Sequence, residues 1–322
     1  MVCGGVRTLP PPVLLYPRQR AAETPAREHP QPFPAARFPK GKPPLRSEFP
    51  WKEEAYPMKI YLSADIEGTA GIIDWKEANE EHPQYAYFQK QMTREVAAAC
   101  EGAIAAGAAD VLVKDAHYTA RNIIHTMLPE QARLFRGWDE TPEIMMAGLD
   151  ESFDGVLFTG YHAAAYTDTN PLSHTMSLRV QSLKCNGKLI AEFDLNAMTA
   201  ASLGVPVYFL SGDRGLCLAA KDTSPQLMTV TTNEGFGGGV IALHPDTAVK
   251  RIRETVRAAL QCPKPPALYP MPGEFTLEIC YKEHAHAKKA AAFPGVKQLD
   301  AKTVVYESKN FRDVLTAAFW IL

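Results

Sequence analysis

The sequence lacks any apolar run of about 18 residues, which is the length that a membrane-spanning helix requires. It also lacks the basic excess that general nucleic-acid binders and anionic-membrane binders need. Its 34 Lys and Arg residues stand against 36 Asp and Glu residues, which gives a formal net charge of −2. We therefore expect neither a membrane span nor a nucleic-acid partner.

Cysteine is scarce as well, and its spacing argues against two kinds of site. The six cysteines form no C-x-x-C pair: they are Cys3, Cys100, Cys185, Cys217, Cys262 and Cys280. Scattered cysteines are typical of reduced thiols rather than of a disulfide framework or a thiolate zinc site. We expect a reducing compartment, and hence a cytoplasmic protein.

Targeting signals are not evident at the N-terminus. Pro10, Pro11 and Pro12 interrupt the apolar stretch there, and no small-residue cleavage site follows an uninterrupted apolar region. A transit peptide would be rich in serine, whereas Ser47 is the single serine of residues 1–57. The sequence therefore predicts neither a secretory signal nor a transit peptide.

Proline is concentrated in residues 1–57, which hold 13 of the 26 prolines and nine Lys and Arg against five Asp and Glu. Because proline fixes φ and removes an N–H donor, so rich a segment can bury and pair little. We expect 1–57 to be a disordered or mis-assigned extension and Met58 to be the functional start. The rest is long enough for one large α/β domain with a small appendage.

Short apolar strands alternate with helices after Met58. The pattern predicts strands at 59–64, 111–113, 156–158 and 207–210, helices at 84–107, 194–204 and 246–261, and a hairpin at 177–191. Continuous apolar strands separated by helices indicate a three-layer αβα domain with a largely parallel or mixed sheet. We expect this domain to span 58–262, and 263–322 to form a linker and a small α+β part.

Two acidic residues, Asp65 and Glu67, directly follow the first expected strand. In an extended chain, residues i and i+2 share a face, so both carboxylates would point the same way beyond the carboxyl end of that strand. Ligand sites of open α/β sheets gather at this edge. Taken alone, the pair also fits a solvated acidic loop, or a helix N-cap at Asp65.

Further polar side chains follow other strands. His117 and His162 each come just after a strand, His174 lies farther along, and Glu192 is placed in the second strand of the hairpin. A single histidine in such a position is more often a structural residue than a ligand. Two histidines and three carboxylates at one sheet edge, with no cysteine, instead suit zinc or manganese in a hydrolytic site.

Five runs of sequence together resemble the zinc D-aminopeptidases associated with bacterial dipeptide transport. Their order and approximate spacing match from Met58 through the 190s, and weaker similarity continues to the C-terminus. Residues 1–57 have no counterpart in that family. The runs are Ser63-Ala64-Asp65-Ile66-Glu67-Gly68-Thr69-Ala70-Gly71, Asp115-Ala116-His117, Gly160-Tyr161-His162-Ala163, Ser173-His174-Thr175-Met176 and Glu192-Phe193-Asp194-Leu195-Asn196-Ala197.

The resemblance implies a binuclear aminopeptidase that uses metal-activated water to hydrolyse short peptides with an N-terminal D-residue, typically D-Ala-D-Ala. It implies two Zn²⁺ per subunit, with Mn²⁺ or Co²⁺ as substitutes. Asp65 would bridge both ions, Glu67 and His117 would complete one site, and His162 and Glu192 the other. It also implies a homo-oligomer, a decamer of two stacked pentameric rings.

His174 matches the proposed catalytic histidine of that family, where it is treated as a nucleophile. A neutral imidazole beside an activated water is also a credible general base, or a donor to the oxyanion, and we favour these two roles. Arg214, after the strand at 207–210, could hold the carboxylate of a peptide, or could form a structural ion pair. Asn196, in the last of the five runs, is a second candidate for substrate binding.

Three other patterns are set aside. Ser173 and His174 are neighbours that would point to opposite faces of an extended chain, and no G-x-S-x-G motif is present. His284 and His286 do not face each other on a helix. The glycines at 235–239 lack the ending of a phosphate-binding loop and indicate a flexible turn; they are more numerous than the resemblance leads us to expect.

Two rival functions remain open at this point. A two-metal site of this kind could act on another small amide or ester. The protein could also be a non-catalytic, metal-containing, peptide-binding accessory of a transport system. Structural zinc sites are closed and favour cysteine, so a site built only from oxygen and nitrogen ligands favours catalysis.

Overall fold

The protein is described by a computed structural model that covers residues 57–322. The expectations for residues 1–57 therefore lie outside the described part, except at Pro57. No helix within 57–322 is long and apolar enough to cross a membrane. The five cysteines in this range, Cys100, Cys185, Cys217, Cys262 and Cys280, are all free thiols.

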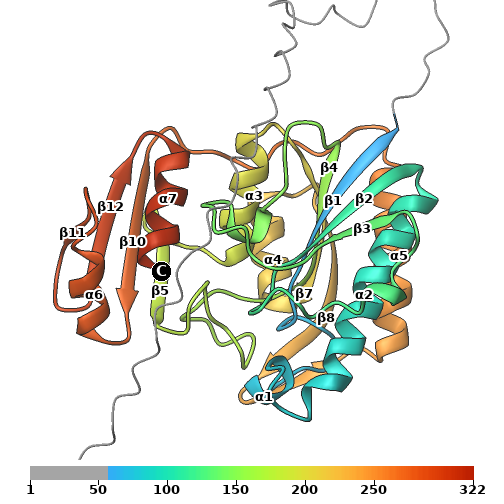
Figure 1. Ribbon diagram of the computed structural model, residues 1–322, viewed down its shortest axis with the longest axis horizontal. Helices are drawn as coiled ribbons and strands as arrows, with labels where there is room; N and C mark the ends of the chain where they lie inside the picture. Colours follow the sequence, from blue (N-terminus) through green and yellow to red (C-terminus); the bar gives the residue numbers. More distant parts are fainter. Residues whose placement is uncertain (1–56) are drawn as a thin grey trace, which may run out of the picture. The chain divides into compact units, whose positions relative to one another are not determined.

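Seven strands form the main sheet, and every neighbouring pair is parallel except the last (Figure 1). In spatial order the strands are β3 (Ala132–Phe135), β2 (Ala108–Asp115), β1 (Met58–Ala64), β4 (Gly155–Tyr161), β7 (Val207–Asp213), β8 (Met228–Phe236) and β9 (Gly239–Ala242). The antiparallel β8–β9 pair makes the sheet mixed.

Helices cover both faces of this sheet. In chain order, the helices of the described residues are α1 (Trp75–Ala78), α2 (Tyr85–Ala105), α3 (Glu192–Ser202), α4 (Arg214–Thr223), α5 (Pro245–Leu260), α6 (His284–Ala290) and α7 (Phe311–Ile321), with 3-10 turns η1 (His125–Met127) and η2 (Ile144–Met146). Of these, α6 and α7 pack on a second sheet. One core joins α2 and α5 to one face, and the other joins α3 and α4 to the opposite face. The expected αβα layering is confirmed.

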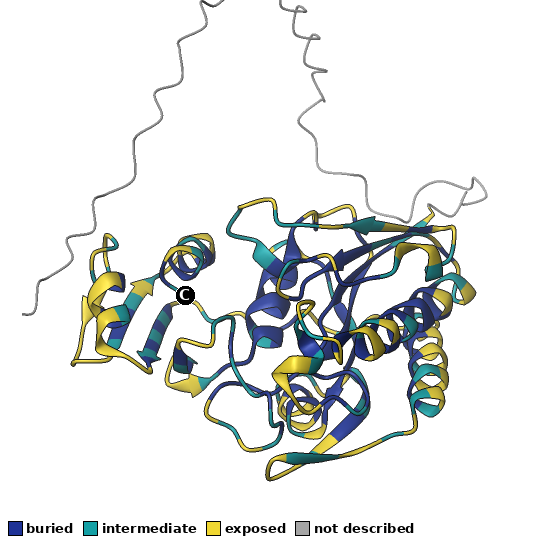
Figure 2. Ribbon diagram, turned by 60° about the horizontal axis from the view of Figure 1, so that its bottom comes forward, coloured by how far each residue is buried: buried dark blue, intermediate teal, exposed yellow. Residues whose placement is uncertain are grey.

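Alternation along β1 shows why the sheet is buried on both sides. Ile60 and Leu62 enter the core with α2 and α5, while Tyr61 enters the other core, because successive side chains point to opposite faces. All three are fully buried. In Figure 2 the central strands of the main sheet are accordingly mostly dark blue, while the helices are yellow on their outer sides.

A second, antiparallel sheet carries the C-terminal part. Its order is β11 (Lys297–Gln298), β12 (Thr303–Ser308), β10 (Phe275–Tyr281), β5 (Val180–Cys185) and β6 (Lys188–Leu189). The expected hairpin therefore supplies two strands to this sheet, since β5 pairs with β10 across a long separation in sequence. Residues on both sides of position 263 contribute to it.

One local expectation was wrong, and another holds only over a shorter range. Glu192 is the first residue of α3 and not part of a strand, because Asp194 Oδ2 accepts a hydrogen bond from Ala191 N at 2.7 Å and so favours a helix start. The glycine-rich segment is not a loose turn over its length: Gly235 belongs to β8 and Gly239 to β9, and the turn is confined to the two glycines between them.

Glu95 is a buried carboxyl on α2 with no cationic partner among the described residues. Its Oε1 accepts hydrogen bonds from Ala70 N and Gln91 Nε2, both at 3.0 Å, and its Oε2 accepts none from described residues. Burial raises the pKa of Glu95 to about 7, although the two hydrogen bonds act in the opposite direction.

The carboxyl group of Glu95 makes the stability of the fold depend on pH. Because its folded pKa is raised, its proton stabilises the fold at low pH, and this contribution is lost as pH rises from the unfolded value near 4.3 through about 7. We expect the difference in unfolding free energy between Glu95→Gln and wild type to shift by about 2 kcal/mol in favour of the variant between pH 5.5 and pH 8. Urea unfolding at both pH values measures this difference, and a constant difference would contradict it.

Candidate metal centre

Three parallel strands end together at the edge of the main sheet where the expected ligands lie. Ala64 of β1 is in register with Asp115 of β2 on one side and with Thr159 of β4 on the other. Asp65, His117 and His162 follow these strands directly, so the register alone brings side chains that are far apart in sequence to one place.

Two glycines allow the loop after β1 to pack directly against the end of β4. A Cβ on Gly160, which has φ +70°, would lie 2.0 Å from the carbonyl oxygen of Asp65. A Cβ on Gly68 would lie 1.9 Å from the carbonyl oxygen of Tyr161. Any larger residue at either position would push the two ligand-bearing segments apart.

The first group of candidate ligands contains Asp65, Glu67 and His117, all buried. His117 Nδ1 lies 3.3 Å from Asp65 Oδ1 and 3.1 Å from Glu67 Oε2. The opposite ring nitrogen, Nε2, is 2.8 Å from the carbonyl oxygen of Ala78, to which it donates a hydrogen bond. That bond leaves Nδ1 as the nitrogen with a free lone pair, facing the two carboxylates.

The second group contains His162, His174 and Glu192. His162 Nε2 lies 3.5 Å from both Glu192 Oε1 and Asp65 Oδ2. His162 Nδ1 is 3.0 Å from the carbonyl oxygen of Ala163, which fixes the tautomer in the same manner as in the first group. Asp65 therefore presents Oδ1 to one histidine and Oδ2 to the other, and lies between the two groups.

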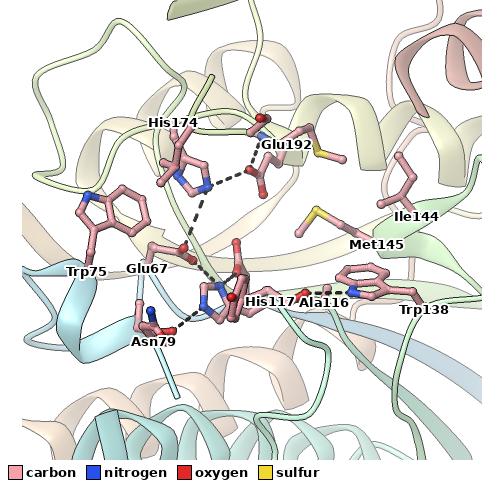
Figure 3. A pocket seen from close by; sticks show the side chains of 16 residues that line it. Glu67, Trp75, Asn79, Ala116, His117, Trp138, Ile144, Met145, His174 and Glu192 are labelled. Atoms are coloured by element: carbon pink, nitrogen blue, oxygen red, sulfur yellow. Dashed lines mark hydrogen bonds and ion pairs between the residues drawn. The ribbon is translucent and has the colours of Figure 1, made fainter. Parts of the chain in front are cut away.

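His174 lies over His162, with the two rings stacked at 4.2 Å between centroids and 8° between planes. Its Nε2 is 3.5 Å from Glu192 Oε1 and 4.0 Å from Glu67 Oε1, as the dashed lines in Figure 3 show. Its Nδ1 is 3.0 Å from the carbonyl oxygen of Leu172. The His174 side chain is 13% exposed, whereas that of His162 is fully buried, so His174 is the histidine of this group that faces the cavity.

The ionisable groups strongly affect one another. Burial and the neighbouring charge of Glu67 raise the pKa of Asp65 well above its usual value. Burial would also raise the pKa of Glu67, but the charge of His117 holds it well below the usual range. Glu192 has a lowered pKa against the same effect of burial, because of His162. Burial and the charge of His162 lower the pKa of His174.

Several buried polar atoms at this centre have no hydrogen-bond partner among the described residues. They are Asp65 Oδ2, Glu67 Oε2 and His162 Nε2. Buried polar atoms are ordinarily satisfied, and buried carboxylates are ordinarily paired with cations or metals. Carboxylate oxygens and imidazole nitrogens with fixed tautomers are ligands that zinc and manganese accept, so the residues present fit divalent ions.

Hydrogen bonds outside the two groups of ligands position the His117 segment. Asp115 accepts from the backbone N–H groups of Asn122 and Ile123 at 2.6 and 2.8 Å, and from Asn122 Nδ2 at 2.8 Å. Asn122 Nδ2 also donates to the carbonyl oxygen of His117, and Asn122 Oδ1 accepts from the Tyr85 hydroxyl. Asp115 was visible in one motif, but its partners become neighbours only through folding.

A cavity of about 480 Å³ opens beside both groups of ligands. Figure 3 shows Trp75 next to His174 on one side, and Trp138, Ile144 and Met145 on the other. No lysine or arginine of the described chain lines this cavity. Its lining consists of Asp65, Glu67, Trp75, Ala78, Asn79, Ala116, His117, Tyr118, Trp138, Ile144, Met145, His174, Met176, Ser177, Leu178 and Glu192.

The two residues expected to contact substrate lie elsewhere. Arg214 Nη1 donates to Glu234 Oε1 at 2.8 Å in an exposed ion pair and does not line the cavity. Asn196 is buried behind the cavity, where its Nδ2 donates to the Tyr161 hydroxyl at 3.0 Å. His284 and His286 lie on α6 and belong to neither group of ligands.

Comparison with known proteins gives one consistent result. A family model described as D-aminopeptidase matches residues 58–319. The chain is similar to the D-aminopeptidase of Bacillus subtilis (strain 168), with 29% identity over 262 residues that cover 81% of this chain and 95% of the relative. It is also similar to the solved structure of the Zn-dependent D-aminopeptidase DppA from Bacillus subtilis, a self-compartmentalizing protease, with a TM-score of 0.76, 29% identity and the same coverage of each chain.

The hydrogen bonds that Asn122 donates should contribute to metal affinity. Asn122→Ala removes the hydrogen bonds from Asn122 Nδ2 to Asp115 and His117, so the orientation of His117 is less restricted. We expect the affinity for Zn²⁺ to fall about 10- to 100-fold, as measured by competition with a chromogenic chelator. Asn310→Ala, which removes the N-cap of α7, is the control and should leave the affinity unchanged. Equal affinities in the two variants would contradict the positioning role.

Proposed function

The chain belongs to the D-aminopeptidase family, and from that premise we propose that it hydrolyses short peptides with an N-terminal D-amino acid at a two-metal centre. The observation that carries the proposal is the position of Asp65 between two groups of ligands, with one carboxylate oxygen toward each. Such a shared carboxylate would suit a two-metal site.

Zinc is the proposed ion, since a similar protein is Zn-dependent and the ligand set fits it, with Mn²⁺ or Co²⁺ as substitutes. Bound zinc would polarise the scissile carbonyl and lower the pKa of water. Glu67 and His117 would hold one ion, His162 and Glu192 the other, and Asp65 both. The hydrogen bonds from His117 to Ala78 and from His162 to Ala163 keep a lone pair of each ring directed at the centre.

His174 is the proposed proton acceptor, and only after it has taken up a proton would its Nε2–H serve as a donor to the oxyanion. Its Nδ1 donates to Leu172, so Nε2 is the acceptor nitrogen, and Nε2 faces the cavity between Glu67 and Glu192. Its lowered pKa keeps the ring neutral near pH 7, which a general base requires. Trp75 packs edge-on against the ring at 5.2 Å between centroids and restricts its movement.

The charges around the cavity favour the amino end of a peptide over its carboxyl end. No lysine or arginine of the described residues lines the cavity. Because the carboxylates of Asp65, Glu67 and Glu192 are themselves the proposed metal ligands, what disfavours the carboxyl end is the lack of a described lysine or arginine that could pair with a free carboxylate. This supports an aminopeptidase rather than a carboxypeptidase, and leaves Arg214 outside the proposed site.

We further propose a homo-oligomer, a decamer of two pentameric rings, since a similar protein is described as self-compartmentalizing.

The free cysteines of the described residues support a cytoplasmic location. D-Ala-D-Ala is the proposed substrate. We retain residues 58–262 as the catalytic domain and 263–322 as the linker and C-terminal α+β part.

The four stereoisomers of Ala-Ala test this function on metal-loaded protein. We expect D-Ala-D-Ala to be hydrolysed at least 100-fold faster than L-Ala-L-Ala, as measured by release of free alanine. Treatment with a chelator should abolish the activity, and added Zn²⁺ should restore it. Equal rates for the D,D and L,L isomers would contradict D-specificity, and activity that survives chelation would contradict the metal mechanism. Metal-dependent hydrolysis of a simple amide or ester but of no dipeptide would indicate another substrate class.

Metal content and turnover should respond differently to three substitutions. Asp65→Ala should lose both ions because it removes the shared ligand, and Glu67→Ala should lose one ion preferentially. His174→Ala should retain both ions and lose about 10²- to 10⁴-fold in kcat. Elemental analysis and D-Ala-D-Ala kinetics measure these effects. Arg214→Ala, an ionic residue outside the cavity, is the control, and wild-type activity in Asp65→Ala would refute the assignment.

A further inference from the structure

We infer that one side of the cavity is a subsite for a bulky apolar side chain of the substrate, next to the scissile bond. This apolar wall consists of Tyr118, Trp138, Ile144 and Met145, which line the same cavity as the candidate ligands. The inference rests on the proposed function and deepens it by naming a substrate class: peptides with a residue such as leucine beside the bond that is cleaved, in preference to alanine alone.

Position gives the first reason. In Figure 3, Trp138, Ile144 and Met145 lie across the centre from Trp75 and His174, so a substrate held between His117 and Glu192 would extend a side chain toward them. The cavity of about 480 Å³ falls within the roughly 300–1,000 Å³ range of pockets that enclose drug-sized ligands. A methyl side chain would leave much of this apolar surface in contact with water.

Trp138 is held rigidly in the wall. Its Nε1 donates a hydrogen bond to the carbonyl oxygen of Tyr118 at 2.8 Å, which satisfies its polar atom. The ammonium group of Lys114 lies 4.2 Å from the centre of the Trp138 ring system. Lys114 is itself fully buried and donates to the carbonyl oxygens of Asp115 and Gly137 at 2.8 and 2.6 Å. Aromatic surface fixed in this way is prepared for contact with a ligand.

The backbone of the cavity gives an independent reason. Tyr118, Ile144 and Met176 have positive φ values of +44°, +47° and +61°, and all three line the cavity. Positive φ is uncommon outside glycine and is a genuine outlier for a β-branched residue such as Ile144. Strained residues of this kind cluster at active sites and ligand-binding sites, where the strained backbone presents the side chain. A glycine at position 144 would be conformationally easier but would present no apolar surface.

Met145 is oriented by a buried polar residue. Asn196 Nδ2 is 3.3 Å from Met145 Sδ, and Met145 O accepts a hydrogen bond from the Ser63 hydroxyl at 2.9 Å. Asn196 therefore acts on the wall and not on the substrate directly. Methionine side chains adapt to apolar ligands of differing shape, so Met145 suits a subsite that accepts more than one apolar residue.

Substrate selectivity tests the subsite. D-Ala-D-Leu and D-Leu-D-Ala place the larger side chain on either side of the cleaved bond, and kcat/KM for each is compared with that for D-Ala-D-Ala on the metal-loaded enzyme. We expect one of the two to exceed D-Ala-D-Ala at least tenfold, because added methylenes in an apolar pocket give effects of this size. Calorimetric titration of the slow His174→Ala variant should show tighter binding of the same dipeptide.

Two substitutions in the wall should reduce this leucine preference to less than about threefold. Trp138→Ala removes the largest apolar surface. Ile144→Gly removes apolar surface while relieving the positive φ, so this variant should fold even if Trp138→Ala does not. Trp320→Ala, a tryptophan that is 67% exposed on α7, is the matched control and should keep the preference.

The outcomes separate the two proposals. Metal-dependent hydrolysis of D-Ala-D-Ala with no gain for either leucine dipeptide would overturn the subsite and leave the proposed function standing. A leucine preference that survives in Ile144→Gly would also overturn the subsite at this wall. No hydrolysis of any D-peptide by metal-loaded protein would overturn the proposed function, and the subsite with it.

Discussion

Three carboxylates, Asp65, Glu67 and Glu192, are buried, each within 3.5 Å of the imidazole of His117 or His162, and the chain must compensate their charge. Charges of one sign in so dry a place repel each other and lose their hydration. The opposed pKa changes of Asp65 and Glu67 are the result: one carboxyl holds a proton more readily while the other remains ionised beside His117. Divalent cations would remove this conflict, and the unpartnered oxygen and nitrogen atoms point to where they would act.

The rest of the domain serves to bring these groups together and keep them there. A parallel sheet ends neighbouring strands at one edge, and Gly68 and Gly160 permit contact between two loops that a side chain would separate. The short helix α1 supplies the carbonyl oxygen of Ala78 to His117 and the indole of Trp75 to His174. Each imidazole is thereby fixed through the nitrogen that does not face the centre, which determines its tautomer.

The cavity combines this charged centre with rigid apolar surface. Positive φ values at Tyr118, Ile144 and Met176 cost about 1–3 kcal/mol each, a cost that the surrounding packing must offset. The ammonium of Lys114 lies beneath Trp138 and donates to two carbonyl oxygens. Burial lowers the pKa of Lys114 to about 8, although the charges of Asp115 and Asp139 act in the opposite direction. Some of the backbone strain and buried charge of the described chain therefore lies around the place where a substrate would bind.

The sequence alone predicts the layered α/β architecture, its first strand and helix α2, because side-chain periodicity is a local property. It also identified Asp65, Glu67, His117, His162, His174 and Glu192, since polar residues at strand ends are visible in one dimension. Tertiary structure alone decided that β5 pairs with β10, that Arg214 pairs with Glu234, and that Asn122 braces His117. These partners are far apart in the chain or share no period, so no local pattern encodes them. The apolar wall is the clearest case: its residues come from η2 and from the segments that follow β2 and β3, and only the folded backbone gives them a common surface.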